Sequence, residues 1–211
     1  VDGEYGPINK IVNHADKLYF LQDRGVGMLS VNPIASATTD EGALILGTGE
    51  VLQDHKYLSF KVGCKHQWSV LSTNRGLYWA DILTNSIYKI GGQGAEELSR
   101  IKGLKSYFED IFEDSYLPET LYDNYEGIPH QWGDNPFYRH GIVSGYDAKN
   151  NEVLFSILKR RPRPMGDRID WVMGTDAETI AYSETTGTFT SFYDFATPMF
   201  IDMQDKLLSV D

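Results

Sequence analysis

WSVLSTNRGLYWADILTNSIYKIGG, from Trp68 to Gly92, has the pattern of three short strands joined by two turns. The turn residues lie at Thr73 to Gly76 and at Asp81 to Asn85, and the runs around them are rich in aromatic and β-branched residues. A meander of this length cannot bury both of its faces alone, so it needs neighbours of the same kind. The stretch therefore predicts an all-β fold built from antiparallel meanders.

Four other regions repeat this alternation of an apolar strand, a polar turn and a strand rich in Tyr, Phe or Ile. They are Lys17 to Val31, Gly141 to Leu158, Thr179 to Phe195 and Met199 to Val210. Their spacing is uneven but lies near that of a four-stranded propeller blade, about 40–50 residues. Between blades, residues 34–42 (IASATTDEG) are small and polar, which predicts a loop.

These regions together predict one β-propeller-like domain over residues 1–211, or a part of one, with an insertion at about residues 94–139. The first residue is Val1 rather than Met, and the last residues, LLSVD, have the pattern of a strand. We therefore expect an incomplete fragment of a larger propeller protein.

The insertion begins with a helical pattern. Its apolar residues recur at three- and four-residue spacings: Leu98, Ile101, Leu104, Phe108 and Phe112. This spacing predicts an amphipathic helix, or two short helices interrupted near Gly103. The acidic residues Glu109, Asp110, Glu113 and Asp114 fall mostly on the outer side of the predicted helix.

The loop that follows, residues 115–138, is far more aromatic than an ordinary connection. Aromatic clusters of this kind pack onto their own domain or onto a partner, and we expect both uses here. Partner contacts are predicted for five residues of the insertion: Phe108, Phe112, Tyr116, Trp132 and Phe137. Tyr and Trp beside Asp and Asn also hold sugars, so a carbohydrate- or receptor-binding module is an alternative.

The charge of the chain disfavours a nucleic-acid-binding module. Its net charge is −11 and its pI about 4.8, and such a surface repels phosphates. A local exception is the basic stretch with Lys159, Arg160, Arg161 and Arg163, whose two prolines indicate an extended loop outside any central strand. A solvated loop that docks on an acidic neighbour is the first interpretation of this stretch, and contact with phosphate or DNA is the second.

Signatures of catalysis, of a cofactor or of a metal site are missing from the sequence. The five histidines are scattered and Cys64 has no second thiol as a partner, which disfavours zinc. Cys64 is expected to be a buried or half-buried apolar residue. There is no G-x-S-x-G nucleophile elbow and no repeated Asp box, and no apolar run is long enough to span a membrane. We expect no enzyme and no cofactor; a glycan-active propeller enzyme is the least favoured alternative.

Several stretches resemble one protein family. They are RGVGMLSVNP (Arg24 to Pro33), VLSTNRGLYWADILTNSIYKIGG (Val70 to Gly92), ELSRIKGLKSYF (Glu97 to Phe108), GIVSGYDAKNNEVLFSI (Gly141 to Ile157) and TIAYSETTGTFTSFYDFATPMF (Thr179 to Phe200). They are similar to the muzzle or nozzle-type tail proteins of crAss-like, short-tailed bacteriophages, also labelled stabilisation proteins.

The resemblance implies a structural subunit of the virion tail that carries a β-propeller. It further implies that such subunits assemble as a ring around the DNA exit channel, in contact with other tail proteins. It provides no catalytic residues to transfer. An acidic lining would leave only passive contact with the exiting phage DNA, because like charges repel.

Overall fold

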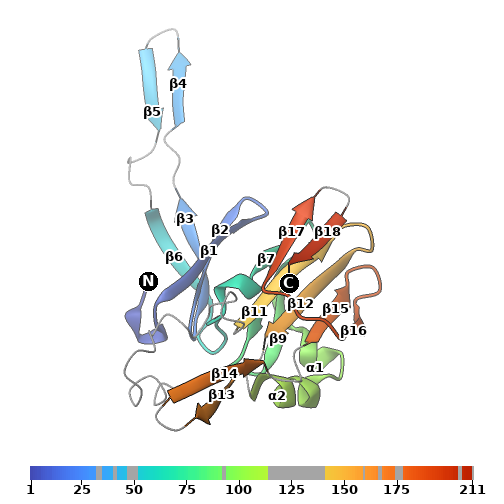
Figure 1. Cartoon of the computed structure of the whole chain (residues 1–211). Helices are drawn as coiled ribbons and strands as arrows, with labels where there is room; N and C mark the ends of the chain where they lie inside the picture. The colour runs from blue at the N-terminus through green and yellow to red at the C-terminus, as the bar shows by residue number, and fades with distance from the viewer. Residues whose placement is uncertain are drawn as a thin grey trace. The chain divides into compact units, whose positions relative to one another are not determined.

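The chain consists mostly of antiparallel β-strands, as predicted (Figure 1). The computed structural model describes residues 1–31, 35–39, 42–46, 52–91, 94–113, 141–158, 160–165, 168–173, 178–203 and 206–210. Internal contacts divide the chain into two compact units, Val1–Gly63 and Cys64–Asp211. Each unit builds its own sheets.

The first unit contains a four-stranded sheet in the order β1-β2-β3-β6. Its elements are the 3-10 helix η1 (Gly3–Tyr5) and the strands β1 (Ile8–His14), β2 (Lys17–Gln22), β3 (Val26–Val31) and β6 (Leu52–Ser59). The turn from β1 to β2 is tight, because Ala15 and Asp16 have positive φ angles of 48° and 59°. The turn predicted at Asp23 to Gly25 is confirmed, since it joins β2 to β3.

A hairpin is inserted between β3 and β6. It consists of β4 (Ala35–Thr39) and β5 (Gly42–Leu46), which pair with each other and with no other described strand. The prediction of a loop over residues 34–42 is therefore wrong for Ala35–Thr39, which form β4. Despite the insertion, β3 and β6 stay paired along their length, from Val26 opposite Ser59 to Val31 opposite Leu52.

The second unit begins with the meander of residues 68–92. Its elements are η2 (Gln67–Ser69), β7 (Leu71–Ser72), β8 (Leu77–Asp81), β9 (Ser86–Gly91) and β10 (Gly94–Glu97), with the sheet order β10-β9-β8-β7. The three predicted strands and both predicted turns are confirmed, although a 3-10 helix replaces the start of the first strand. The fourth strand, β10, was not predicted. Every residue of β8 is buried, so both faces of this strand are covered.

A second four-stranded sheet of this unit has the order β11-β12-β15-β16. Its strands are β11 (Gly141–Asp147), β12 (Glu152–Leu158), β15 (Glu178–Ser183) and β16 (Thr188–Tyr193). The turns predicted at Asp147 to Asn151 and at Glu184 to Gly187 are both present. Asn151 and Gly187 adopt positive φ angles of 55° and 67° there, as tight turns often require.

The basic stretch forms a strand rather than a loop. β13 (Arg160–Met165) pairs with β14 (Arg168–Met173), and these two strands pair with no other described strand. The prediction that this stretch forms a loop is therefore wrong. The prediction that it lies outside any central strand is confirmed, because both strands of the pair are edge strands. Proline is compatible with this position because both strands of a two-stranded sheet are edge strands, whose outward N–H groups need no partner.

The last hairpin, β17 (Met199–Met203) and β18 (Lys206–Val210), lies against β11 (Figure 1). The contact depends on a glycine: a Cβ atom at Gly145 of β11 would come within 2.6 Å of Cγ of Phe200. Thr197 fastens the base of the hairpin, because its N–H donates to Ser156 Oγ at 2.8 Å and its hydroxyl donates to the Val210 carbonyl at 2.6 Å.

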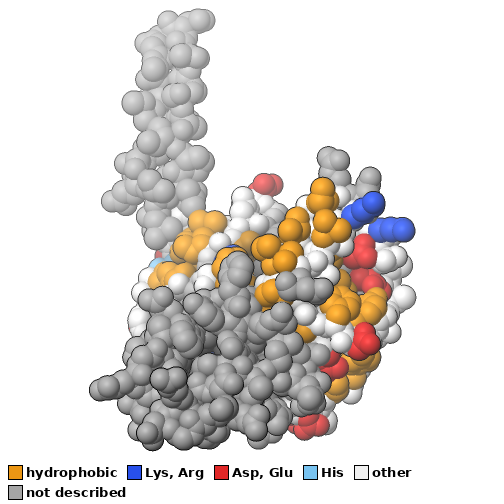
Figure 2. Space-filling model, viewed as in Figure 1, with side chains coloured by type: hydrophobic (Ala, Val, Ile, Leu, Met, Phe, Trp, Pro, Cys, Tyr) orange, Lys and Arg blue, Asp and Glu red, His pale blue; other side chains and the backbone are white. Residues whose placement is uncertain are grey.

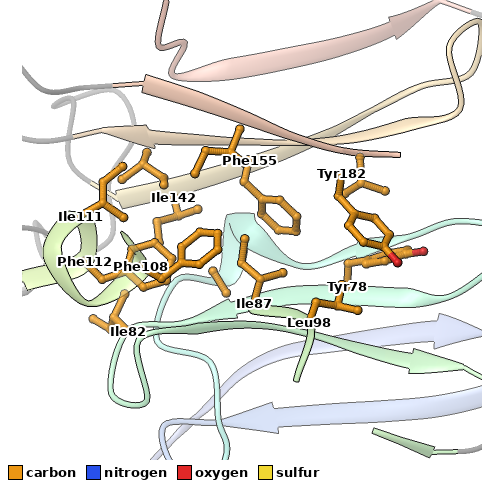
Figure 3. Packing of buried hydrophobic residues seen from close by; sticks show 14 residues of the cluster. Tyr78, Ile82, Ile87, Leu98, Phe108, Ile111, Phe112, Ile142, Phe155 and Tyr182 are labelled. Atoms are coloured by element: carbon orange, nitrogen blue, oxygen red, sulfur yellow. The ribbon is translucent and has the colours of Figure 1, made fainter. Parts of the chain in front are cut away.

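The helical pattern resolves into two short helices, α1 (Leu98–Ile101) and α2 (Lys105–Glu113). They are separated at Gly103, whose φ is 74°, a conformation that ends helices. The core of the second unit forms between α2 and the two four-stranded sheets, with side chains pointing towards one another (Figure 3). Its members include Tyr78, Ile87, Leu98, Phe108, Ile111, Phe112, Ile142, Phe155, Ile180 and Tyr182.

Candidate functional site: surfaces and polar clusters

The predicted partner-binding residues fall into two groups. Phe108 and Phe112 are 0% and 1% exposed and lie in the core with their rings 5.2 Å apart. They hold α2 on the sheets, and a direct contact with a partner would require the core to open. Tyr116, Trp132 and Phe137 lie outside the described residues, so partner contacts by the aromatic loop stay a prediction.

The outer side of α2 is acidic. Glu109 and Asp110 are exposed, as the helical pattern predicted. Between this outer side and the core, the hydroxyl of Tyr107 donates a hydrogen bond to Glu178 Oε1. Burial raises the pKa of Tyr107, and the neighbouring Glu178 carboxylate raises it further. The helix is therefore fixed to the second sheet by both apolar and polar contacts.

A buried carboxylate connects the two sheets of the second unit. Glu184, in the turn from β15 to β16, is 8% exposed. Its Oε1 accepts hydrogen bonds from Thr73 Oγ1 at 2.6 Å and from the hydroxyl of Tyr78 at 2.8 Å. The guanidinium of Arg75 donates to the Glu184 carbonyl oxygen at 2.8 Å. The predicted turns at Thr73 to Gly76 and at Glu184 to Gly187 thus contribute polar residues to one cluster.

The carboxylate changes the acidity of the tyrosines around it. Burial raises the pKa of Tyr78, and its hydrogen bond to Glu184 and the negative charge of that residue raise the pKa further. Burial also raises the pKa of Tyr146, and the Glu184 charge is the next cause. Both hydroxyls consequently stay protonated and able to donate well above neutral pH.

The position of Glu184 favours a structural role over a catalytic one. A general base must lie within hydrogen-bond reach of a substrate, whereas Glu184 is only 8% exposed. Its Oε1 accepts from two hydroxyls of the protein itself, and its Oε2 is buried without a hydrogen-bond partner among the described residues. A surface pocket among the described residues lies in the first unit, where its lining includes Asn13, Lys17 and Met28. Sequence reasoning located both turns but not this cluster, because nothing in the local pattern pairs Thr73 with a residue 111 positions away.

Cys64 is fully buried, which confirms the prediction of a buried apolar position. Its thiol donates to the carbonyl oxygen of His66 at 3.2 Å, and the hydroxyl of Ser69 donates to the same oxygen at 2.7 Å.

Within the described ranges, no group of three His, Cys, Asp or Glu residues is arranged to hold a metal ion. No described helix is long and apolar enough to cross a membrane.

An aromatic cluster lies at one end of the first unit. Tyr5, Tyr57 and Phe60 have ring centroids 4.9–5.4 Å apart, and Phe60 is 56% exposed. The polar groups beside these rings bond to the protein: the Tyr57 hydroxyl donates to Gln22 Oε1 at 2.7 Å, and Gln22 Nε2 donates to the Gly6 carbonyl at 2.6 Å. The cluster therefore fastens the N-terminal segment to the sheet.

The outer face of the β17–β18 hairpin is apolar and exposed. Register places alternate residues of the two strands on this face, and five of them are 36–57% exposed: Met199, Ile201, Met203, Leu208 and Val210. Figure 2 shows hydrophobic side chains gathered over these strands. Contiguous apolar surface of this kind is typical of protein–protein contacts.

Comparison with known proteins identifies the family. A sequence profile described as Crassvirus muzzle protein matches residues 1–211. The chain is also 24% identical over 196 residues to a protein of Bacteroides phage crAss001 named Muzzle protein. That alignment covers 92% of this chain and 12% of the phage protein, so the chain spans about an eighth of the length of its relative. Because the family match extends over the whole chain, this chain belongs to the Crassvirus muzzle protein family.

Proposed function

We propose that this chain is a structural part of the phage virion, within a muzzle or nozzle assembly around the DNA exit channel at the end of the tail. The observation that carries the proposal is the match of the muzzle family to all 211 residues. The name of the crAss001 relative agrees with it. Its partners would be other tail proteins and further copies of itself, arranged as a ring.

The three four-stranded sheets are proposed to be blades of a β-propeller, within a single domain. Each sheet is an antiparallel meander in chain order: β1-β2-β3-β6, β7 to β10, and β11-β12-β15-β16. The four strands that are skipped in this order, β4, β5, β13 and β14, form two inserted hairpins, and the order of each meander is kept around them. Four-stranded meanders packed face to face are the architecture of propeller blades.

A rigid and chemically inert subunit suits this role. Most backbone groups of such a sheet are hydrogen-bonded, which resists fraying under load. The net charge of −11 opposes capture of passing DNA, so contact with the exiting duplex would be passive. The buried Glu184 cluster supports a non-enzymatic role, because its donors bind the carboxylate from within the fold.

The location is tested by labelling intact virions. Antibodies raised against residues 1–211 and coupled to gold particles are expected to mark the end of the tail in electron micrographs. Antibodies against a capsid protein of the same phage serve as the control for particle integrity. Gold on the capsid would contradict the proposal. Intact particles with exposed tails that carry no gold would contradict it as well.

A further inference from the structure

We propose that the outer face of the β17–β18 hairpin is covered by an antiparallel sheet from a part of the muzzle polypeptide outside residues 1–211. The inference rests on the proposed function, since it adds a sheet to the proposed series of propeller blades. It does not depend on the proposed place at the end of the tail.

The hairpin forms a third layer of the second unit. The side chain of Ile142 on β11 lies in the core between the two four-stranded sheets. Gly145 is three residues further along the same strand, so it belongs to the opposite face of β11, and Phe200 of β17 lies directly against it. Val143, on the same side as Gly145, is only 6% exposed. The hairpin therefore covers the side of the second sheet that faces away from the core.

Both faces of the hairpin are apolar. Phe200 and Leu207 are half-buried on its inner face. The outer face has six positions, of which Lys206 is the one charged residue and the other five are the apolar residues named above (Figure 2). Strands that are apolar on both faces are typical of positions that are buried on both sides.

Two other strands of the same unit show the contrast. β8 is buried on both faces, and four of its five residues are apolar. β16 has one exposed face, on which Thr188 and Thr190 accompany Phe192. The outer face of the hairpin resembles the covered strand rather than the exposed one, so we expect it to be covered as well.

The size of this face favours a cover from the same polypeptide over one from a separate chain. Its five apolar residues, each 36–57% exposed, present about 400 Å² of surface. A stable interface between separate chains buries ~800 Å² on each partner. A contact within one polypeptide needs less area, because the linkage between the two surfaces provides a high effective concentration.

Muzzle proteins contain enough polypeptide to provide the cover. The matching region is 12% of the crAss001 protein, so most of that relative lies outside it. A sheet is the expected element, because the hairpin extends a stack of sheets that already pack face to face, and such sheets interdigitate their apolar side chains. Its contacting face should be poor in charge, since a charge buried there without a partner is costly.

The test is hydroxyl-radical footprinting of Met199 and Met203, read by mass spectrometry. Residues 1–211 alone are compared with the complete polypeptide that the phage encodes, isolated as a monomer. Both methionines should be oxidised more slowly in the complete polypeptide, by about fivefold or more, because oxidation of methionine follows its exposure. Phe60, which is 56% exposed in the first unit, reports the radical dose and should react equally in both samples.

A pair of variants tests whether the outer face itself makes the contact. Ile201→Lys/Leu208→Lys places two charges on this face and keeps both methionines, whose oxidation in the complete polypeptide should return to the rate seen in residues 1–211. Thr188→Lys/Thr190→Lys adds the same charges to the exposed face of β16 and should keep the protection. Circular dichroism establishes that each variant is folded.

Four results would overturn the inference. Slow oxidation already in residues 1–211 would assign the cover to this chain itself, and slow oxidation only in oligomers would assign it to a second copy. Rapid oxidation in every sample would show a free face, and protection that survives Ile201→Lys/Leu208→Lys would place the contact elsewhere. Gold on the capsid, with both methionines protected in the monomer, would overturn the proposed place in the tail and leave this inference intact.

Discussion

Glu184 illustrates how one buried residue can join two sheets. Its carboxylate accepts from Tyr78, whose side chain is fully buried, and removing a donor to a buried charged group is costly. We expect Tyr78→Phe to lower the free energy of unfolding by about 1.5–3 kcal/mol, measured by urea denaturation at pH 7. Tyr193→Phe, on the half-exposed strand β16, should change it by less than about 0.5 kcal/mol. Equal losses in the two variants would contradict this role of Glu184.

The same hydroxyl gives the chain a stability that depends on pH. The pKa of Tyr78 is raised above its usual value of 10.0 in the folded chain, so the unfolded chain loses this proton first as the pH rises. The contribution of the protonated Tyr78 hydroxyl to the free energy of unfolding is therefore complete below pH 10 and declines above it. Urea midpoints measured from pH 8 to 11 should fall above pH 10, and should fall less steeply in Tyr78→Phe. If the urea midpoint fell equally steeply with pH in the wild type and in Tyr78→Phe, Tyr78 would be excluded as a cause of the pH dependence.

Phe108 is expected to behave as a core residue. Because its ring is fully buried in the cluster, Phe108→Ala should lower the free energy of unfolding by about 3–5 kcal/mol. Ile101→Ala, in the same insertion but at a position that is 61% exposed, is the control and should be nearly neutral. Thermal melts of both variants check this. A Phe108→Ala protein as stable as the wild type would restore a surface role for this residue.

These residues also mark what sequence can predict about a site. The spacing of Phe108 and Phe112 correctly predicted an apolar helix face. It could not tell whether that face covers its own sheets or a partner, because both demand the same residue types. The Glu184 cluster was missed for a different reason, since its donors meet the carboxylate only after two distant turns are brought together.

At the scale of elements, the contact of the β17–β18 hairpin with β11 depends on Gly145. A methyl group there would overlap the Phe200 side chain, so Gly145→Ala should weaken this contact by about 1–3 kcal/mol. Hydrogen exchange is expected to accelerate in β17 and β18, with β12 and β15 unchanged. Gly3→Ala is the control, because nothing lies within 4 Å of its Cβ position. Unchanged exchange in the hairpin would show that it does not rely on this close packing.

The elements were predicted best where local chemistry determines them. Turns at Thr73, Asp147 and Glu184 carry residues that favour turns in any context, and all three are present. β4 and β13 were missed because one is small and polar and the other is basic and rich in proline. Both exist through pairing with a neighbouring strand, which a local pattern does not contain.

At the scale of the whole molecule, charge dominates the behaviour towards polyanions. With a net charge of −11, the intact chain should not bind a fluorescent 30-base-pair duplex at ~0.15 M salt at protein concentrations up to ~10 μM, because non-specific binding depends on release of counterions by basic groups. Fluorescence anisotropy checks this, with a basic DNA-binding protein as the positive control. Saturable binding would contradict a passive relation to DNA.

The inserted hairpins have a practical consequence. β3 and β6 stay paired although β4 and β5 intervene, and β12 and β15 stay paired around β13 and β14. The sheets therefore accommodate extra polypeptide at two defined junctions: β12 and β15 keep an unbroken register, and β3 and β6 stay paired with a register shift between Ser30 and Val31, beside the insertion. Such junctions are natural grafting points: a reporter peptide or an affinity tag placed there could be carried on the particle, and phages could diversify these outgrowths while the framework beneath them stays constant.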